Sequence, residues 1–266
     1  MRLGGKYKSH VSVLGELMSS AFRLDGQVAV VTGAGKGIGR GIALCLAQAG
    51  ADVVVSSRTA ADLERLSKEI QDLGQRSIPV PADVSEVEAL QGIAAAAAEL
   101  GTLGIWVNNA GGLPDATPRY LTKTPEDRWD AQLDLNLKAV FQGCMVAAEH
   151  MDSGSIINIS SITARGAAMK NGPYAASKAA VNSLTQTMSL EMAPHIRVNA
   201  VGPGPIPTEN FNASTNFPEG TAVEKVIGVP LQRLGTPEDI GHAVVYLASP
   251  AASWITGQCL YVSGGL

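Results

Sequence analysis

The 266-residue chain has few cysteines, no surplus of basic residues and no long apolar run, and each shortage excludes a class of protein. Its three cysteines, Cys45, Cys144 and Cys259, lie far apart without CxxC spacing, which predicts buried thiols in a reducing compartment. A formal net charge of −4 argues against nucleic acid or an anionic membrane as a principal partner. The four histidines show no metal-ligand spacing, so we expect no metal site.

Two further shortages concern the membrane and the start of the chain. No apolar run reaches the length of a membrane span, and the opening segment lacks the sustained apolar region of a signal peptide. We therefore expect a cytoplasmic protein. Residues 1–23 are expected to form an N-terminal extension, loosely ordered or a short helix. With 45% apolar residues, the remainder, 24–266, can bury the core of one large domain.

Short β-branched runs alternate with longer Ala- and Leu-rich segments along this domain. The pattern predicts strands at 28–31, 52–57, 104–108, 155–160 and 196–201, and helices at about 38–49, 59–73, 85–100, 125–151 and 173–193. Continuously apolar strands separated by helices predict a parallel sheet that is covered on both faces. The expected fold is therefore α/β, a single doubly wound Rossmann domain. The segment 202–228, rich in Pro, Asn and Thr, is expected to be a substrate-binding loop.

A glycine-rich turn, TGAGKGIG, follows the first expected strand. Gly33, Gly37 and Gly39 permit a tight turn and let backbone N–H groups approach a pyrophosphate at the N-terminus of the next helix. The position between a strand and a helix favours dinucleotide binding. The alternative is a tight turn that binds nothing.

A tyrosine and a lysine stand four residues apart in NGPYAASKAA, so a helix here places Tyr174 and Lys178 on one face. One interpretation is an amphipathic pair, with the ring on the core and the lysine stem extending outward. The other is acid–base chemistry, because a neighbouring cation favours the phenolate. Lowering the phenol pKa from about 10 by about 3 units requires roughly 4 kcal/mol. A second cation, such as an oxidised nicotinamide ring, would have to contribute.

Further motifs, in order, resemble those of the short-chain dehydrogenase/reductase family over residues 24–265. They are TGxxxGxG at 32–39, NNAG at 108–111, NISS at 158–161, YAASK at 174–178 and VNAVGPGPIPT at 198–208. Ser161 stands 13 residues before Tyr174, as the family spaces them, and Asn136 in LDLNLKAV matches the family's helix asparagine. The resemblance implies a mostly parallel seven-stranded sheet flanked by helices. It also implies hydride transfer between the nicotinamide and a carbonyl or secondary alcohol carbon, with NAD(P) as acceptor for CH–OH groups.

The same resemblance implies catalytic roles for four residues. Tyr174 would exchange a proton with the substrate oxygen. Lys178 would lower the tyrosine pKa and hold the nicotinamide ribose, and Ser161 would stabilise the substrate oxygen. Asn136 would help to hold a water that links Lys178 to solvent. Two alternatives stay open: Ser161 as the cap of a turn, and Asn136 as a partner of the backbone.

The cofactor contacts implied by the family extend over several loops. Asp83 would bond the adenine amine; its alternative role is to cap the following helix, for which Ser85 is the better candidate. The residues expected at the cofactor are Gly33, Lys36, Gly37, Ile38, Gly39, Ser57, Arg58, Asp83, Val84, Asn109, Ala110, Gly111, Tyr174, Lys178, Pro203, Gly204, Ile206 and Thr208.

The choice between the two nicotinamide dinucleotides is expected to depend on the end of the second strand, VVVSSRT. A carboxylate there would accept from the 2′-hydroxyl of NAD and repel a 2′-phosphate. This chain has Ser57 followed by Arg58, and Lys36 in the neighbouring turn. We expect both cations to converge on one phosphate, and hence NADP(H) to be preferred over NAD(H). The alternative is that they are ordinary solvated loop residues.

The substrate is less defined. The segments FRLDG and SPAASW…GQ…VSGG look closest to bacterial hydroxysteroid dehydrogenases, which implies a cyclic or steroid-like ketone or alcohol. One alternative is a 3-oxoacyl-[acyl-carrier-protein] reductase, although the Ser–Tyr loop offers such a partner only Arg165 and Lys170. A non-catalytic dinucleotide sensor is another class, which the intact set of four catalytic residues disfavours. The resemblance also implies a homotetramer, formed through the helices over 125–151 and 173–193 and the C-terminal segment.

Overall fold

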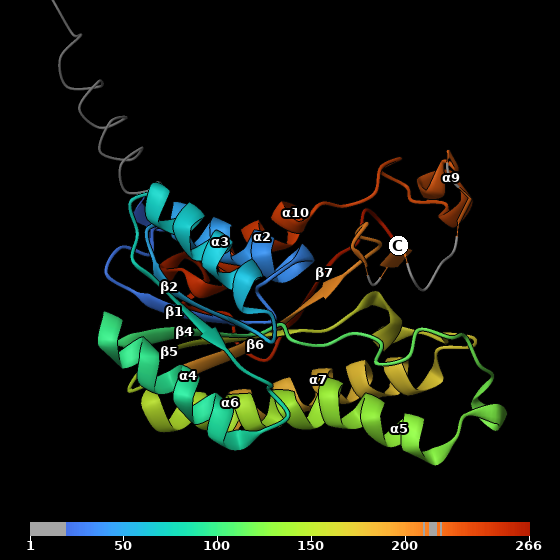
Figure 1. The fold of residues 1–266 in the computed structure, drawn as a ribbon, viewed down its shortest axis with the longest axis horizontal. Helices are drawn as coiled ribbons and strands as arrows, with labels where there is room; N and C mark the ends of the chain where they lie inside the picture. Colours follow the sequence, from blue (N-terminus) through green and yellow to red (C-terminus); the bar gives the residue numbers. More distant parts are fainter. Residues whose placement is uncertain (1–19, 210, 213–216, 219) are drawn as a thin grey trace, which may run out of the picture.

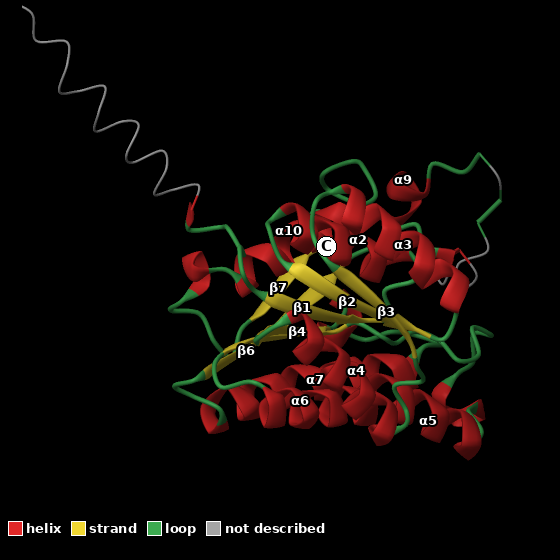
Figure 2. Cartoon of the chain, turned by 60° about the vertical axis from the view of Figure 1, so that its left-hand side comes forward, coloured by secondary structure: helices red, strands yellow, loops and turns green. Residues whose placement is uncertain are grey.

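The computed structural model describes residues 20–209, 211–212, 217–218 and 220–266. In this part of the chain, one sheet of seven strands lies between two layers of helices (Figure 1, Figure 2). The doubly wound α/β fold predicted from the sequence is confirmed. Most of the expected N-terminal extension, residues 1–19, lies outside the described residues.

The sheet contains seven strands, and every pairing between neighbours is parallel. They are β1 (Val28–Thr32), β2 (Asp52–Ser57), β3 (Ser77–Pro81), β4 (Leu103–Asn108), β5 (Gly154–Ile159), β6 (Ile196–Pro203) and β7 (Cys259–Val262), in sheet order β3-β2-β1-β4-β5-β6-β7. The expected sheet was mostly parallel, and the observed one is wholly so. Because β1 and β4 are neighbours but not consecutive, the winding direction changes between them, and ligands bind at such a point beyond the carboxyl ends of the strands.

Helices cover the two faces of the sheet as two distinct layers (Figure 1). One layer consists of α2 (Gly37–Gln48), α3 (Ala60–Asp72) and α10 (Pro237–Ala248). The other consists of α4 (Val87–Leu100), α5 (Glu126–Leu133), α6 (Ala139–His150) and α7 (Gly172–Glu191). The first layer carries the turn after β1, whereas the second carries the helix with Tyr174 and Lys178.

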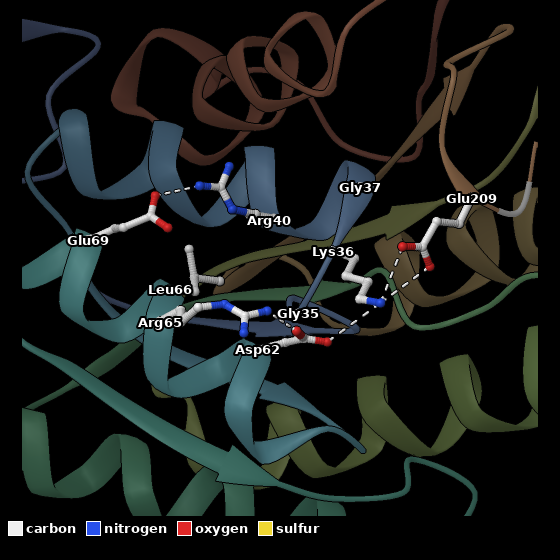
Figure 3. A pocket seen from close by; sticks show the side chains of 9 residues that line it. All are labelled: Gly35, Lys36, Gly37, Arg40, Asp62, Arg65, Leu66, Glu69 and Glu209. Atoms are coloured by element: carbon white, nitrogen blue, oxygen red, sulfur yellow. Dashed lines mark hydrogen bonds and ion pairs between the residues drawn. The ribbon is translucent and has the colours of Figure 1, made fainter.

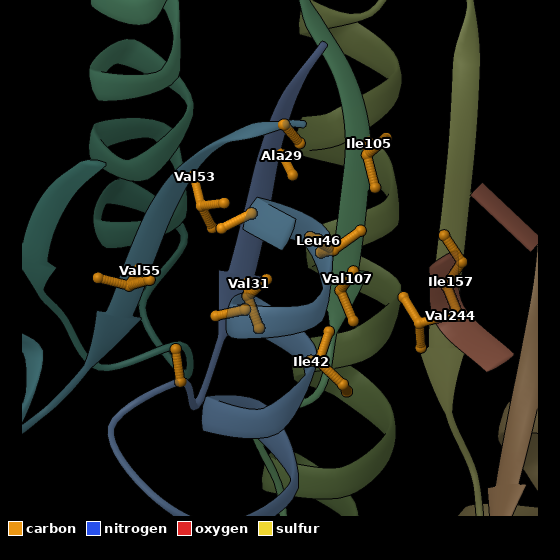
Figure 4. Packing of buried hydrophobic residues seen from close by; sticks show 14 of the residues in the cluster. Ala29, Val31, Ile42, Leu46, Val53, Val55, Ile105, Val107, Ile157 and Val244 are labelled. Carbon is orange, nitrogen blue, oxygen red and sulfur yellow. The ribbon is translucent and has the colours of Figure 1, made fainter. Parts of the chain in front are cut away.

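Alternate residues of each central strand pack against opposite layers. On the face that α2 covers, Ala29 and Val31 of β1 pair with Val53 and Val55 of β2 and pack against Leu46, as Figure 4 shows. The intervening residues, such as Val30, Val54 and Trp106, belong to the cluster beneath α4 and α6. Since both faces are covered, the middle positions of the central strands β1, β2 and β4 are apolar on both sides, which explains the continuous runs in the sequence.

The helix expected over 125–151 is divided by a π-helical turn, Asp134–Lys138, between α5 and α6. Single π turns within α-helices are rare, and those that occur are often found at functional sites. The turn places Asn136 fully inside the protein. The sequence predicted one uninterrupted helix, because no particular residue types mark a π turn.

The first two residues of the expected loop 202–228 belong to β6, and the loop contains a short helix, α9 (Val223–Ile227). Residues 210, 213–216 and 219 of this loop lie outside the described residues. Among the described residues, no helix combines the length and apolarity needed to cross a membrane.

Candidate active site

Three loops meet at the carboxyl ends of β1, β4 and β6, and glycines permit their close approach. Gly33 has φ +64°, and a Cβ atom there would lie 2.8 Å from the Cα of Ala110. A Cβ on Gly39 would lie 2.3 Å from the carbonyl oxygen of Gly33. On Gly37 it would lie 3.0 Å from a methyl carbon of Thr208. The structure therefore brings the glycine-rich turn, the NNAG loop and the loop after β6 together.

The hydroxyl of Thr32 fixes the two central loops to one another. It donates to the carbonyl of Val107 at 3.2 Å and accepts from the backbone N–H groups of Asn109 and Ala110, both at 3.0 Å. The Asn109 amide returns the contact, donating to the carbonyls of Thr32 (2.9 Å) and Gly33 (3.1 Å). Thr32 was not among the expected site residues, although it is the first letter of the TGxxxGxG motif.

The residues of this crevice fit a dinucleotide. The N-terminus of α2 begins at Gly37 in the turn, where a helix favours a pyrophosphate. At the end of β2, the hydroxyl of Ser57 is buried and has no hydrogen-bond partner among the described residues. A Cβ on Gly35 would come within 2.8 Å of that oxygen. A buried hydroxyl beneath a bare glycine offers a donor to a ligand that lies against the turn.

Beside the turn lies a cavity of about 240 Å³ whose charged side chains are already paired (Figure 3). The ammonium of Lys36 lies 3.2 Å from the carboxylate of Glu209 and 3.8 Å from that of Asp62. Asp62 also pairs with Arg65, and Arg40 pairs with Glu69. Asp62 and Glu209 were not predicted as site residues, although each stands close to a motif in the sequence.

Arg58 is exposed and does not line this cavity. Its positive charge acts on the pKa of Asp83. That pKa is lowered chiefly by hydrogen bonds from Ser85 and to a smaller extent by Arg58. The expected convergence with Lys36 is therefore not present among the contacts of residues 20–209, 211–212, 217–218 and 220–266. Asp83 accepts from the Ser85 backbone at 3.0 Å and its hydroxyl at 2.8 Å. The expectation that Ser85 caps the next helix is wrong, because Glu86 occupies the N-cap of α4.

The remaining cofactor candidates lie along the same edge of the sheet. Val84 and Ile206 are buried, and Ile38 is partly buried in the first turn of α2. Pro203 ends β6, and the backbone N–H of Gly204 donates to Val262 at 2.9 Å, which fixes the loop to β7. These contacts direct the loop with Thr208 back towards the glycine turn.

Tyr174 and Lys178 lie on the first turns of α7, next to Ser161 at the end of β5. The ammonium of Lys178 is buried, donates to the carbonyl of Ile159 at 2.8 Å, and lies 5.8 Å from the centroid of the Tyr174 ring. The hydroxyl of Ser161 accepts from the backbone of Thr163 at 3.2 Å and from its hydroxyl at 3.0 Å. Ser161 thus caps the short helix that follows, as one alternative predicted, while it also neighbours Tyr174.

The protonation of this pair is governed by burial. Burial raises the pKa of Tyr174 above its ordinary value, and hydrogen bonding with Ser161 works in the opposite direction. Burial lowers the pKa of Lys178 to about 8. The sequence predicted that Lys178 lowers the tyrosine pKa; among the chain's own groups, burial has the larger effect. At pH 7 the phenol is protonated and the lysine is mostly charged.

Asn136 connects this pair to the NNAG loop. Its amide accepts from the backbone N–H of Gly112 at 2.9 Å and donates to the carbonyls of Gly112 (2.9 Å) and Gln132 (3.1 Å). A Cβ on Gly111 would lie 2.8 Å from the Asn136 oxygen and 3.4 Å from the Lys178 ammonium. The alternative of backbone bonding is therefore observed. It positions the loop directly beside Lys178.

Comparison with known proteins gives a consistent result. A family model described as Enoyl-(Acyl carrier protein) reductase matches residues 33–266. The 7alpha-hydroxysteroid dehydrogenase of Escherichia coli (strain K12) is 38% identical over 93% of this chain and 96% of its own. The 3-oxoacyl-[acyl-carrier-protein] reductase FabG of Thermotoga maritima is 35% identical over 92% of this chain and 99% of its own. A solved 7 alpha-hydroxysteroid dehydrogenase, complexed with NADH and 7-oxo glycochenodeoxycholic acid, has a TM-score of 0.85 at 37% identity, covering 93% of this chain and 96% of that one.

The lowered pKa of Lys178 predicts a pH-dependent stability that Lys178→Met removes. Between about pH 8, the folded value, and pH 10.5, the ordinary value, the unfolded chain holds a proton that the folded chain has released. The wild type should therefore gain stability relative to Lys178→Met as pH rises through this window, by up to about 3 kcal/mol. Urea unfolding from pH 7 to 10.5 measures this difference. Lys123→Met, which removes an exposed lysine, should show the same pH dependence of stability as the wild type. Parallel curves for wild type and Lys178→Met would contradict the burial of the charge.

Proposed function

Because the chain belongs to the short-chain dehydrogenase/reductase family, whose fold binds a nicotinamide dinucleotide, we propose that it reduces ketones with NADPH. Membership makes it an oxidoreductase that acts on CH–OH groups. The proposal adds the cofactor preference, the direction and the roles of individual residues.

The arrangement of Tyr174, Ser161 and Lys178 at the carboxyl edge of the sheet carries this proposal. The bound nicotinamide supplies the hydride. Tyr174 donates its proton to the developing alkoxide, for which a protonated phenol is suited. Ser161 hydrogen-bonds the same oxygen. Lys178 holds the nicotinamide ribose and stabilises the phenolate that remains after proton transfer.

Asn136 acts as a positioning residue in this proposal. It holds the backbone of Gly112 beside Lys178 through two hydrogen bonds. An amide oxygen accepts two hydrogen bonds, so the second lone pair is assigned to a water that returns protons from solvent to Lys178. This water supports repeated turnover, because each reduction consumes one proton from the site.

The substrate proposed is a cyclic or steroid-like ketone. Support comes from the hydroxysteroid dehydrogenases among the relatives, at 38% identity for the Escherichia coli protein. The FabG relative at 35% identity supports a second candidate, reduction of a 3-oxoacyl group on a carrier protein. The two differ in what accompanies the carbonyl, a compact ring system or a long flexible thioester.

The preference for NADP(H) rests on the chemistry at the end of β2. Ser57 provides a buried hydroxyl, without a partner in the described part of the chain, where a carboxylate would repel a 2′-phosphate. Arg58 is exposed beside it and can move to a phosphate. Lys36 must exchange Glu209 and Asp62 for that phosphate. Charge-assisted hydrogen bonds of about 1.5–3 kcal/mol each make the exchange favourable only for the cofactor that carries the phosphate.

A panel of cyclic, steroidal and acyl-thioester ketones, assayed with NADPH and with NADH, tests the function. We expect turnover of cyclic ketones, with kcat/KM for NADPH at least tenfold above that for NADH. Arg58→Ala should raise the KM for NADPH about 10-fold or more and scarcely change that for NADH. Arg23→Ala, an exposed arginine paired with Asp25, is the matched control and should change neither. Equal efficiency with both cofactors, or a preference for NADH, would refute the assignment.

Tyr174→Phe removes only the hydroxyl that transfers the proton. Turnover should fall by at least ~10²-fold, the lower range for loss of general acid–base catalysis, while NADPH affinity, measured by fluorescence titration, should survive. Lys178→Ala should reduce both turnover and cofactor affinity. Tyr246→Phe, which alters a ring packed near Phe22, serves as the control and should retain full activity. Substantial residual activity of folded Tyr174→Phe would remove the phenol from the mechanism.

We also propose a cytoplasmic homotetramer. The free thiols of Cys45, Cys144 and Cys259 support a reducing location. On the helices expected to form the interface, Phe141 of α6 and Leu190 of α7 are exposed. Light scattering should give four times the 27.5 kDa of the chain. Phe141→Glu should reduce the assembly, and Leu73→Glu, beside α3 in the opposite layer, should not. A stable wild-type monomer at micromolar concentration would contradict the tetramer.

A further inference from the structure

A second cavity, of about 190 Å³, lies beside Tyr174 and is lined by charges that the reaction does not use. Three segments form it: 113–119, 124–132 and 170–174. About 10–15 Å³ of such volume is enough for one water, so the cavity holds several waters and fits the tail of a small substrate. Its charged lining residues are Asp115, Arg119, Asp127, Arg128 and Lys170.

Three of these charges are accounted for by the fold. Arg128 pairs with the carboxylate of Asp115 at 2.7 Å and donates to its carbonyl at 2.9 Å. Asp115 also accepts from the backbone of Thr117 at 2.8 Å. Asp127 lies in the first turn of α5, where a carboxylate stabilises the N-terminus of a helix. Arg119 and Lys170 form no ion pair among the described residues, although the charge of Arg119 contributes to the lowered pKa of Asp115.

Arg119 and Lys170 belong to different loops that are joined at this point. The backbone N–H of Arg119 donates to the carbonyl of Lys170 at 3.1 Å. In the described part of the chain, neither side chain takes part in an ion pair, and the Lys170 ammonium lies 5.2 Å from the ring centroid of Tyr120. Two cations from separate loops are thus joined through their backbones in the lining of a cavity that also includes Tyr174.

The backbone at Lys170 adds an independent observation. The turn from Ala168 to Asn171 is closed by a hydrogen bond of 3.1 Å between their backbones, with Lys170 third in the turn at φ +66°. A positive φ at this position favours glycine. Non-glycine residues in the left-handed region are uncommon and cluster at functional sites. Position 170 therefore carries a lysine side chain although its backbone conformation favours glycine.

The guanidinium of Arg128, another residue of the cavity lining, has a donor to spare. The Nη1 of Arg128 is buried and has no hydrogen-bond partner among the described residues. A buried donor without an acceptor is costly, and an arriving carboxylate oxygen would remove that cost. Guanidinium groups bind carboxylates through paired N–H donors, and an ammonium contributes a point charge.

We propose that this cavity binds a carboxylate on the tail of the substrate, so that the preferred substrates are keto acids. Arg119 and Lys170 are the specificity-determining residues, and Arg128 supplies an additional donor. The inference rests on the proposed ketone reduction, since the carbonyl is taken to lie at Tyr174 while the carboxylate occupies the cavity. It adds a recognition element that neither hydride transfer nor cofactor preference requires.

Matched pairs of substrates test the proposal. The panel consists of cyclic ketones whose ring carries a carboxylate on a side chain of two to six methylenes, each beside its methyl ester, assayed with NADPH. The wild type should prefer the acid in at least one pair by about tenfold or more in kcat/KM. In Arg119→Gln/Lys170→Gln this acid-to-ester ratio should fall by about tenfold or more, since loss of one charge-assisted hydrogen bond corresponds to about 10- to 150-fold. Lys123→Gln, which removes an exposed charge four residues from Arg119 and outside the cavity lining, should keep the wild-type ratio.

A binding measurement separates this inference from the proposed function. Calorimetry should show that a saturated carboxylate, which cannot be reduced, binds the NADP⁺-treated wild type about tenfold more tightly than its primary amide. Arg119→Gln/Lys170→Gln should lose that difference. If none of the cyclic, steroidal and acyl-thioester ketones is reduced with NADPH or NADH, the proposed function fails, and the calorimetric pair still decides the carboxylate site. The proposal would be overturned by equal binding of acid and amide or by an unchanged acid-to-ester ratio in the double variant. It would also be overturned if neutral carrier-bound thioesters were reduced faster than any acid.

Discussion

The close contact between the turn after β1 and the loop after β4 is the constraint on which the site depends. Only a residue without a side chain can occupy Gly33, because a Cβ would come within 2.8 Å of the Ala110 Cα. The Thr32 hydroxyl holds the contact by bonding two successive backbone N–H groups. The same loop continues to Gly111 and Gly112, which lie against Lys178 and Asn136. A displacement at this contact would therefore reach both the crevice for the dinucleotide and the proton-transfer residues.

Much of this arrangement could be predicted from the sequence because it depends on local pattern and on parallel strand order. Strands with both faces buried are largely apolar, so the positions of five strands were predicted. The positions of β3 and β7 were not, because these strands are mostly only partly buried. The four catalytic candidates stand in motifs of fixed spacing. The partners of Lys36 could not be predicted, because Glu209 is 173 residues distant and pairing of exposed charges has no sequence pattern. Neither Asp83 nor Ser85, the two residues weighed as caps of the next helix, holds that place, because α4 begins later, with Glu86 at its N-cap.

The charged side chains beside the glycine turn are neutralised by partners of opposite sign. The cavity beside the glycine turn holds three cations and three carboxylates, all in pairs. Recognition of an anion there is an exchange of partners, whose free energy is the difference between two sets of ion pairs. Such differences are smaller than the individual interactions. Cofactor discrimination should therefore respond to Asp62 and Glu209 as much as to the cations they neutralise.

The π turn at Asp134–Lys138 has a consequence for how this region can vary in length. A π turn carries one residue more than an α turn, and each residue advances a helix by about 100°. The faces of α5 and α6 are consequently out of phase, so that α5 borders the second cavity while α6 covers the sheet. Deleting one residue here would leave a longer and more regular helix. It would also rotate one half against the other, turning either the Asn136 side or the core side towards solvent. A regular α-helix through α5 and α6 would therefore be incompatible with the present position of Asn136.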